Sequence, residues 1–209
     1  MDEAGKGSVL GPMVVAAVGV SSENVFDEFE VADSKLLSPK MRERLYVIIR
    51  KRFKVASVRI DAHEIDEIRT GITMNACVAR AHAQVIDKLS PSVAYVDACD
   101  VNAFRYADTV KSFLEQRCEI VSEHHADQTF KVVSAASIVA KVTRDRAIMA
   151  LSKKYGNIGS GYPSDPVTIA FLSAYIDEHK CPPPIARKSW KTVSAMLGKK
   201  QQSQLSEFF

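Results

Sequence analysis

The sequence contains no apolar run long enough to cross a membrane, and it does not open with a charged-then-apolar signal sequence. Its four cysteines, Cys77, Cys99, Cys118 and Cys181, are widely spaced and form no CxxC pair. This spacing favours small buried thiols in a reducing compartment over zinc sites or disulfides. We therefore expect a cytoplasmic protein.

The chain also lacks a strong excess of charge of either sign. Its net charge is +3 and its pI about 8.6, which permits nucleic-acid binding without arguing for it. Basic residues gather near the C-terminus, at Arg187, Lys188, Lys191, Lys199 and Lys200. A local basic face could follow phosphates there, but from charge alone a solvated helix surface is an equally good interpretation.

Length and periodicity predict the fold class. The 209 residues, 46% of them hydrophobic, suffice for a core and could form one domain, or one domain with a subdomain. Strand and helix patterns alternate over the first 125 residues, and helices dominate the rest. We expect an α/β fold, with a mixed sheet flanked by helices and a helical C-terminal extension. The expected divisions are a core at 1–150, the extension at 151–197 and a flexible tail at 198–209.

Individual elements follow from local signals. Strands are expected at 8–20, 55–61, 93–96 and 119–122, where apolar residues run together or alternate. Helices are expected from the Ser38–Pro39 start, at 74–89, at 103–117, from a Ser134 cap to Leu151, at 168–179 and around Trp190. The composition of residues 198–204 predicts disorder.

An acidic pair opens the chain. Asp2 and Glu3 run directly into Ala-Gly-Lys-Gly at positions 4–7. Two carboxylates hold a divalent metal, the glycines permit close approach of a nucleic-acid strand, and Lys6 can meet a phosphate. On a regular strand the two acids point to opposite faces, so joint metal binding requires a strand end or bend there.

Two further acids stand apart from this pair. Asp97 closes the strand expected at 93–96, and the carboxyl end of a strand is where ligands bind in an open α/β sheet. Asp127 follows His124, His125 and Ala126. Taken singly, each aspartate is better explained as a turn or cap residue, and the histidines, although possible proton-transfer groups, are better explained as surface residues.

Several motifs in order resemble one family. These are DEAGKGSVLGP at 2–12, DSK at 33–35, YVD at 95–97, AD at 126–127, SAASIVAKV at 134–142 and GSGYPSDP at 159–166. Together they resemble type 2 ribonuclease H, most closely its archaeal members, over nearly the whole chain. The resemblance implies a ribonuclease H-like fold.

The resemblance also implies the chemistry. Asp2, Glu3, Asp97 and Asp127 would be the catalytic residues and would hold Mg²⁺ or Mn²⁺. Such ions take carboxylate oxygens, activate water and stabilise a leaving oxygen, so no side-chain nucleophile is required. The expected activity is endonucleolytic cleavage of RNA in RNA/DNA hybrids and at ribonucleotides embedded in duplex DNA. The expected products carry a 5′-phosphate and a 3′-hydroxyl.

Substrate recognition is implied at further positions. In the family, the glycine-lysine-glycine segment and a loop tyrosine read the ribose 2′-hydroxyl, which alone separates RNA from DNA at a given site. Gly5, Lys6, Gly7 and Tyr162 match those positions. Phosphate contacts are expected from Lys35, Ser134 and Lys141, although for Lys35 a solvated lysine is an equally good interpretation.

The last eight residues form a separate motif. Gln202, Leu205, Phe208 and Phe209 follow the pattern Q-x-x-L-x-x-F-F, which resembles the clamp-binding peptide of archaeal and eukaryotic replication proteins. On a helical turn the three apolar side chains gather on one side and could fill a groove. We expect a sliding clamp as partner and a monomeric enzyme. The alternative is a tail that packs on its own domain.

Two rival functions would leave features unexplained. Another nuclease of the same fold, such as a resolvase, gives no reason for Tyr162 or for the glycine-lysine-glycine segment. A non-catalytic clamp adaptor has no use for four acids. A dinucleotide-binding interpretation of the early glycines fails on their spacing and on the lack of a preceding strand.

Overall fold

The computed structural model describes residues 1–26 and 37–206, excluding the side chains of residues 23, 24 and 199–206. The described chain forms two compact units, each built from separate segments. Unit 1 contains Met1–Lys6, Val14–Arg59 and Ile72–Arg144, and unit 2 contains Gly7–Met13, Ile60–Gly71 and Asp145–Phe209. The divisions expected at residues 150 and 197 remain predictions. No helix in the described part is long and apolar enough to cross a membrane.

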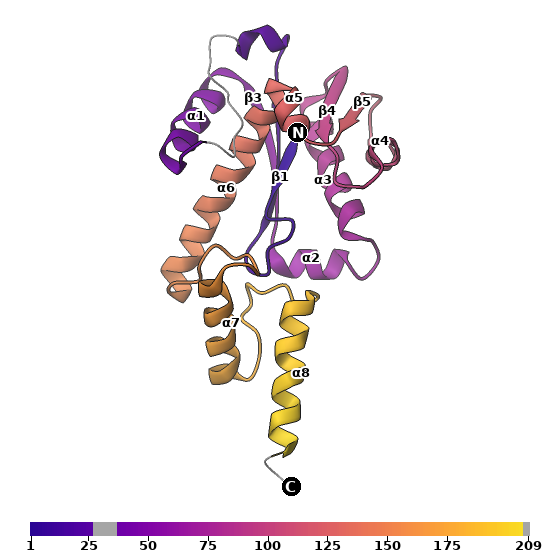
Figure 1. Cartoon of the computed structure of the whole chain (residues 1–209). Helices are drawn as coiled ribbons and strands as arrows, with labels where there is room; N and C mark the ends of the chain where they lie inside the picture. Colours follow the sequence, from indigo (N-terminus) through magenta and orange to yellow (C-terminus); the bar gives the residue numbers. More distant parts are fainter. Residues whose placement is uncertain (27–36, 207–209) are drawn as a thin grey trace. The chain divides into compact units, whose positions relative to one another are not determined.

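Unit 1 holds most of the strands. β1 (Asp2–Ala4) pairs antiparallel with β2 (Met13–Gly19), so that Glu3 lies opposite Val15, and β2 neighbours β3 (Lys54–Ile60). β4 (Val93–Asp97) pairs in parallel with β5 (Glu119–Glu123). The strand expected at 8–20 therefore begins only at Met13, because the preceding residues form other backbone contacts. Figure 1 shows these elements.

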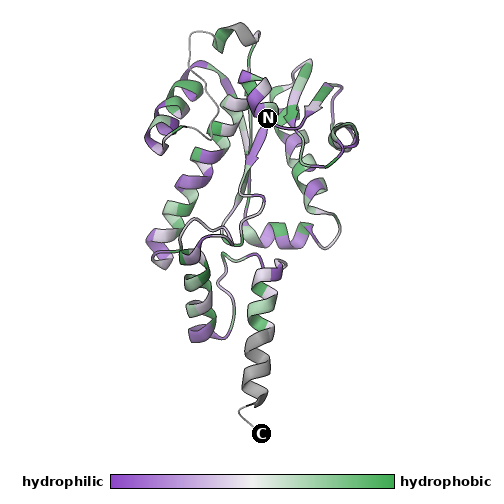
Figure 2. Ribbon diagram, viewed as in Figure 1, coloured by the Kyte–Doolittle hydropathy of each residue, from purple (hydrophilic) through white to green (hydrophobic). Residues whose placement is uncertain are grey.

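Helices pack against the three-stranded sheet formed by β1, β2 and β3. α1 (Pro39–Arg52) and α6 (Lys131–Tyr155) contribute to one core with β2, through side chains such as Ile49, Val14 and Val139. α3 (Met74–Leu89) lies near the opposite face, where Leu89 approaches Gly19. Hydrophobic and hydrophilic residues alternate along α1, α3 and α6, as expected of helices with one packed face (Figure 2).

The local signals explain several boundaries. Ser38 accepts a hydrogen bond from the Met41 amide and Pro39 opens α1, as predicted. α3 has the bounds expected, between a Thr73 cap and a left-handed Ser90. The prediction that Ser134 caps a helix was wrong. The helix α6 begins three residues earlier, at Lys131, and the Ser134 amide donates to the Phe130 carbonyl.

Short helices complete unit 1. α4 (Ala103–Lys111) ends before the predicted residue 117, and α5 (Ala126–Thr129) was not predicted. A 3₁₀ turn, η1, spans Glu23–Phe26.

Unit 2 has its own core. α7 (Pro166–His179) and α8 (Lys191–Ser206) pack through Leu172, Ile176 and Val193. α2 (Ala62–Ile68) was not predicted. α8 runs through residues 198–204, where composition predicted disorder.

Arg187 fixes the C-terminal part of unit 2. Its side chain is fully buried, and its Nε and Nη2 donate to the Gly11 carbonyl at 3.2 and 3.1 Å. Trp190 lies against two guanidinium groups, those of Arg69 and Arg187, each 4.9 Å from its ring centroid. The basic face suggested for this stretch therefore excludes Arg187, which is an interior residue.

We predict that Arg187→Lys lowers the free energy of unfolding by about 2–3 kcal/mol, because a lysine cannot make the forked contact with Gly11. Chemical denaturation monitored by circular dichroism measures this loss. Lys188→Ala, at an exposed neighbour, is the control and should change stability by less than about 0.5 kcal/mol. Equal stability of both variants would show that the Arg187 contacts stabilise little.

Candidate active site

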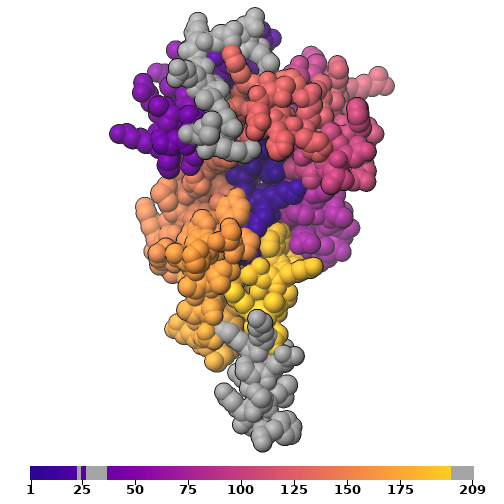
Figure 3. Space-filling model, viewed as in Figure 1, coloured from indigo at the N-terminus to yellow at the C-terminus, as the bar shows by residue number. Residues whose placement is uncertain are grey.

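The acidic pair lies on β1, next to the strand that carries the third acid. The Met1 amino group donates to the Tyr95 carbonyl at 2.6 Å, and the Asp97 amide donates to the Met1 carbonyl at 3.2 Å. These bonds join β1 to β4. Asp2 is 6% exposed and the Glu3 side chain 13% exposed, so both carboxylates are largely withdrawn from water. N-terminal residues, in indigo, are visible at the centre of the face drawn in Figure 3.

The fourth acid, Asp127, comes directly after a residue that is hydrogen-bonded to the third acid, Asp97. Asp97 Oδ1 accepts a hydrogen bond from the Ala126 amide at 3.0 Å, at the start of α5. Asp127 is the next residue and is 4% exposed. The structure thus brings the end of β4 and the start of α5 together, and with them the two acids that sequence alone left open as turn residues.

Electrostatics show that the acids on β1 and β4 influence one another. Burial, and after it the negative charge of Asp2, raise the pKa of Glu3 from its ordinary value of 4.5 to about 7. Asp97 adds to this rise, while Lys6 and a hydrogen bond from Cys99 oppose it. A carboxyl group whose ionisation is opposed by burial and by neighbouring acids is a position where a cation would be stabilised.

The donor set suits a hard divalent cation in its chemistry. Glu3 Oε2 is buried and has no hydrogen-bond partner among the described residues. In the described part of the chain, however, no three or more His, Cys, Asp or Glu side chains are gathered as a metal-holding group. Asp97 and Glu3 instead accept hydrogen bonds from Ala126 and Cys99. Metal binding by the four acids therefore remains a proposal.

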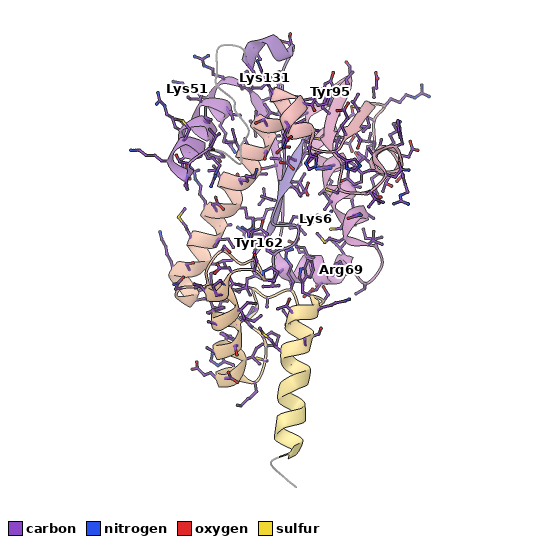
Figure 4. The ribbon with its side chains drawn as sticks, viewed as in Figure 1. Lys6, Lys51, Arg69, Tyr95, Lys131 and Tyr162 are labelled. Atoms are coloured by element: carbon purple, nitrogen blue, oxygen red, sulfur yellow. The ribbon has the colours of Figure 1, made fainter. Side chains whose placement is uncertain are left out.

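The glycine-lysine-glycine segment begins at the end of β1. Gly5 has φ 85°, a left-handed conformation that lets the chain turn directly after Ala4. The Lys6 ammonium donates to the Cys99 carbonyl at 3.1 Å, which keeps its positive charge near Glu3. Gly7 is exposed, and a Cβ built there would meet nothing within 4 Å. Figure 4 labels Lys6 after β1.

The rest of this loop is bonded to the Tyr162 loop within unit 2. The amides of Val9 and Leu10 both donate to the Gly161 carbonyl, at 2.8 and 3.1 Å. Further along the same loop, the Gly11 amide donates to the Ile185 carbonyl at 2.8 Å. Backbone hydrogen bonds therefore join Val9 and Leu10, which follow the predicted ribose-reading residue Gly7, to Gly161, which precedes Tyr162.

The Tyr162 loop is fixed by its own turn chemistry. Asp165 caps α7 and accepts hydrogen bonds from the amides of Ser160 and Val167, which lower its pKa to about 2. A side chain at Gly159 would meet Asp165 and Thr168 atoms at 2.6 Å. Tyr162 is half-buried on this platform, and Figure 4 labels it.

The other predicted contact residues are placed less clearly for binding. Ser134 is 2% exposed, and the Lys141 ammonium donates to the Ser137 hydroxyl at 2.8 Å. Lys35, Phe208 and Phe209 lie outside the described residues. For Gln202 and Leu205 the structure describes the backbone, which belongs to α8, and no side chain.

Sequence reasoning missed three residues beside Glu3. Cys99 Sγ donates to Glu3 Oε1 at 3.1 Å, and His82 Nε2 lies 3.9 Å from Glu3 Oε2. The Tyr106 hydroxyl contacts His82 Nδ1 at 2.9 Å. A polar histidine on the buried face of the helix at 74–89 was the one signal in the sequence that could have indicated this cluster.

Comparison with known proteins agrees with this geometry. The family model described as ribonuclease HII matches residues 1–193. A ribonuclease HII from Methanoregula boonei is 69% identical over 209 residues, covering 100% of this chain and 98% of the relative. The chain belongs to the ribonuclease HII family. It is thus a ribonuclease H, a hydrolase of the endonuclease type from a family that cleaves RNA in RNA/DNA hybrids.

Solved ribonuclease HII structures confirm the fold. The ribonuclease H2 of Pyrococcus horikoshii matches with a TM-score of 0.88 and 37% identity, covering 96% of this chain and 97% of that one. A structure of the PCNA:RNase HII complex from Archaeoglobus fulgidus matches with a TM-score of 0.86 and 40% identity, covering 93% and 94%. The predicted ribonuclease H-like α/β fold is confirmed.

The raised pKa of Glu3 yields a prediction about stability without metal. Because the folded state binds this proton more tightly than the unfolded state, stability is lost as pH rises from about 4.5 to about 7. In metal-free buffer at pH 8, Glu3→Gln should therefore melt higher than wild type. The gain is on the order of 1–3 kcal/mol, or roughly 3–10 °C. The gain should vanish near pH 4.

Scanning calorimetry in EDTA at pH 4, 6 and 8 is the measurement. Glu115→Gln, at an exposed position, is the control and should show no such pH-dependent gain. A Glu3→Gln variant that melts with wild type at every pH would mean that Glu3 ionises normally.

Proposed function

We propose that this ribonuclease HII family member cleaves at ribonucleotides embedded in duplex DNA as well as in RNA/DNA hybrids. The proposed reaction is two-metal phosphodiester hydrolysis that leaves a 5′-phosphate and a 3′-hydroxyl. The observation that carries the proposal is the Glu3 carboxylate, whose Oε2 is buried without a hydrogen-bond partner among the described residues and whose pKa is raised by burial and then by the charges of Asp2 and Asp97.

Asp2, Glu3, Asp97 and Asp127 would hold Mg²⁺ or Mn²⁺, whose bound charge lowers the pKa of water and stabilises a leaving oxygen. The protein itself fixes the positions of the elements that carry these acids. The hydrogen bonds from Asp97 to Met1 and from Ala126 to Asp97 hold β1, β4 and α5 together. Burial withdraws the acids from bulk water, which strengthens their attraction for a cation.

Ribose recognition would come from Gly5, Lys6, Gly7 and Tyr162. The open surroundings of Gly7 support close approach of a strand, and the bonds from Val9 and Leu10 to Gly161 support joint action of the two loops. Lys35, Ser134 and Lys141 would add phosphate contacts that position the duplex without reading its sequence.

A sliding clamp would recruit the enzyme through Gln202, Leu205, Phe208 and Phe209. The Archaeoglobus fulgidus relative was solved as a complex with PCNA, which supports a partner of this kind. The adjacent phenylalanines at the chain end supply apolar area for such a contact. The enzyme itself would act as a monomer.

We predict that Asp97→Asn and Asp127→Asn each remove most cleavage of a DNA duplex that contains one ribonucleotide. Each change removes a metal-holding charge, at a loss of several kcal/mol in transition-state stabilisation. Folding should persist, because the asparagine at 97 keeps an acceptor for the Ala126 amide. Steady-state cleavage in Mg²⁺ measures the effect, with melting temperature as the check on folding.

The same assay tests the proposed activity. An all-DNA duplex of the same sequence is the substrate control and should stay intact. Equal cleavage of both duplexes would contradict ribonucleotide recognition, and near wild-type rates in either variant would remove that aspartate from the site.

We predict that deleting residues 202–209 abolishes binding to a trimeric sliding clamp and leaves cleavage of free substrate almost unchanged. Leu205, Phe208 and Phe209 should supply the binding energy, at roughly 1.5–3 kcal/mol per fully buried side chain before ordering costs. The double variant Phe208→Ala with Phe209→Ala should match the deletion. Calorimetry with the clamp of the same organism measures both.

Retained clamp affinity in the deletion would contradict this role of the tail. A fall of many degrees in the melting temperature of the isolated protein would instead favour the alternative of a tail packed on its own domain.

A further inference from the structure

A set of buried and partly buried side chains lies around the Glu3 carboxylate. We call it the Glu3 cluster; its members are Glu3, Cys99, Tyr106 and His82. Cys99 Sγ donates to Glu3 Oε1 at 3.1 Å, and the Tyr106 hydroxyl contacts His82 Nδ1 at 2.9 Å. His82 Nε2 faces Glu3 Oε2 at 3.9 Å.

The contact between His82 and Glu3 joins two atoms for which the described residues provide no hydrogen-bond partner. Glu3 Oε2 and His82 Nε2 are both buried, and neither has a hydrogen-bond partner in the described part of the chain. Leaving such atoms unsatisfied is costly, and a separation of 3.9 Å is too long for a hydrogen bond. A movement of the Glu3 carboxylate by about 1 Å toward His82 would satisfy both atoms.

The contact between Tyr106 and His82 relates the two nitrogens of the imidazole. His82 is 0% exposed and Tyr106 is 1% exposed, so their polar atoms depend on each other for hydrogen bonding. The tautomer of a histidine is set by the hydrogen bond that one ring nitrogen makes. With the Tyr106 hydroxyl donating to Nδ1, the imidazole proton sits on Nε2, which is the atom facing Glu3.

The two sides of the Glu3 carboxylate then have matching donors. Cys99 supplies one to Oε1 and His82 supplies one to Oε2, while the remaining lone pairs stay available to a cation. Donors of this kind behind a metal-holding carboxylate fix its orientation, and their loss usually weakens metal binding by 10–100-fold.

We propose that His82, held in one tautomer by Tyr106, is a positioning residue that donates from Nε2 to Glu3 Oε2 and orients this carboxylate for a divalent cation. The proposal rests on the proposed function, in which Glu3 is a metal-holding acid. It assigns a task to a histidine that would otherwise only fill the interior between α3 and α4.

Variants of the full chain separate positioning from packing. His82→Gln keeps an N–H donor at about the reach of Nε2, whereas His82→Phe fills similar space without a donor. Tyr106→Phe keeps the volume of the aromatic side chain and removes only the hydroxyl that selects the His82 tautomer. His63→Gln, at an exposed histidine of α2, is the matched control.

The main readout is Mn²⁺ affinity without substrate, measured by calorimetry on variants whose near-ultraviolet circular dichroism matches wild type. We expect His82→Phe and Tyr106→Phe to bind Mn²⁺ 10–100-fold more weakly. His82→Gln should stay within a few-fold of wild type, and His63→Gln should equal it. Equal affinity of all variants, or equal losses in His82→Gln and His82→Phe, would overturn the positioning role.

A second readout remains informative if a His82 variant fails to fold. Nitrogen-15 spectra of the wild-type imidazole should show His82 protonated on Nε2 alone. A proton on Nδ1 would overturn the proposal. A wild-type protein that binds no Mn²⁺ would overturn the proposed function itself and with it this role, whereas normal wild-type binding with unaffected variants would overturn only the role of His82.

Discussion

The structure of the candidate site depends on one constraint, which is the burial of the Glu3 carboxylate beside other acids. Burial and the charge of Asp2 raise its pKa to about 7, so the site is strained electrostatically when no cation is bound. The surrounding contacts reduce this strain only in part. Lys6 brings a positive charge, and Cys99 donates one hydrogen bond. Such incomplete compensation is typical of functional sites, where stability is sacrificed for binding.

The second unit obeys a different constraint, which is backbone geometry. The loop at residues 7–13 is bonded on one side to Gly161 and on the other to residues 185–187. Arg187, although charged, is buried to hold the Gly11 carbonyl. Residues far apart in sequence therefore set the shape of the loop that contains Gly7. These contacts give a glycine-rich segment a defined shape, which the proposed reading of ribose requires.

Much of the fold was predictable where local signals are strong. Ser38 and Pro39 marked the start of α1, Ser90 and Pro91 marked the end of α3, and an apolar run ending in Asp97 gave β4. Short elements carried too little signal: α2 has only Ala62 and Ile65 buried, which is too few for a periodic pattern. α4 ended early for no local reason that the sequence displays.

The site was predictable to a lesser degree. Each of the four acids was identified through motifs, but the bonds that join their strands involve residues about 30 to 95 positions apart. The same holds for His82 and Cys99, whose contacts with Glu3 no local pattern encodes. Arg187 was expected on a basic surface because charge normally avoids the interior, and only its partners Gly11 and Trp190 explain the exception.

The central claim is that Glu3 is a buried carboxyl whose ionisation is opposed by its neighbours until a divalent cation binds. The most direct measurement is a carbon-13 NMR titration of the Glu3 side-chain carboxyl, with and without Mg²⁺. The account predicts a pKa near 7 in metal-free buffer and a clear fall when Mg²⁺ is added. A pKa at the ordinary value of 4.5 that does not respond to Mg²⁺ would contradict it.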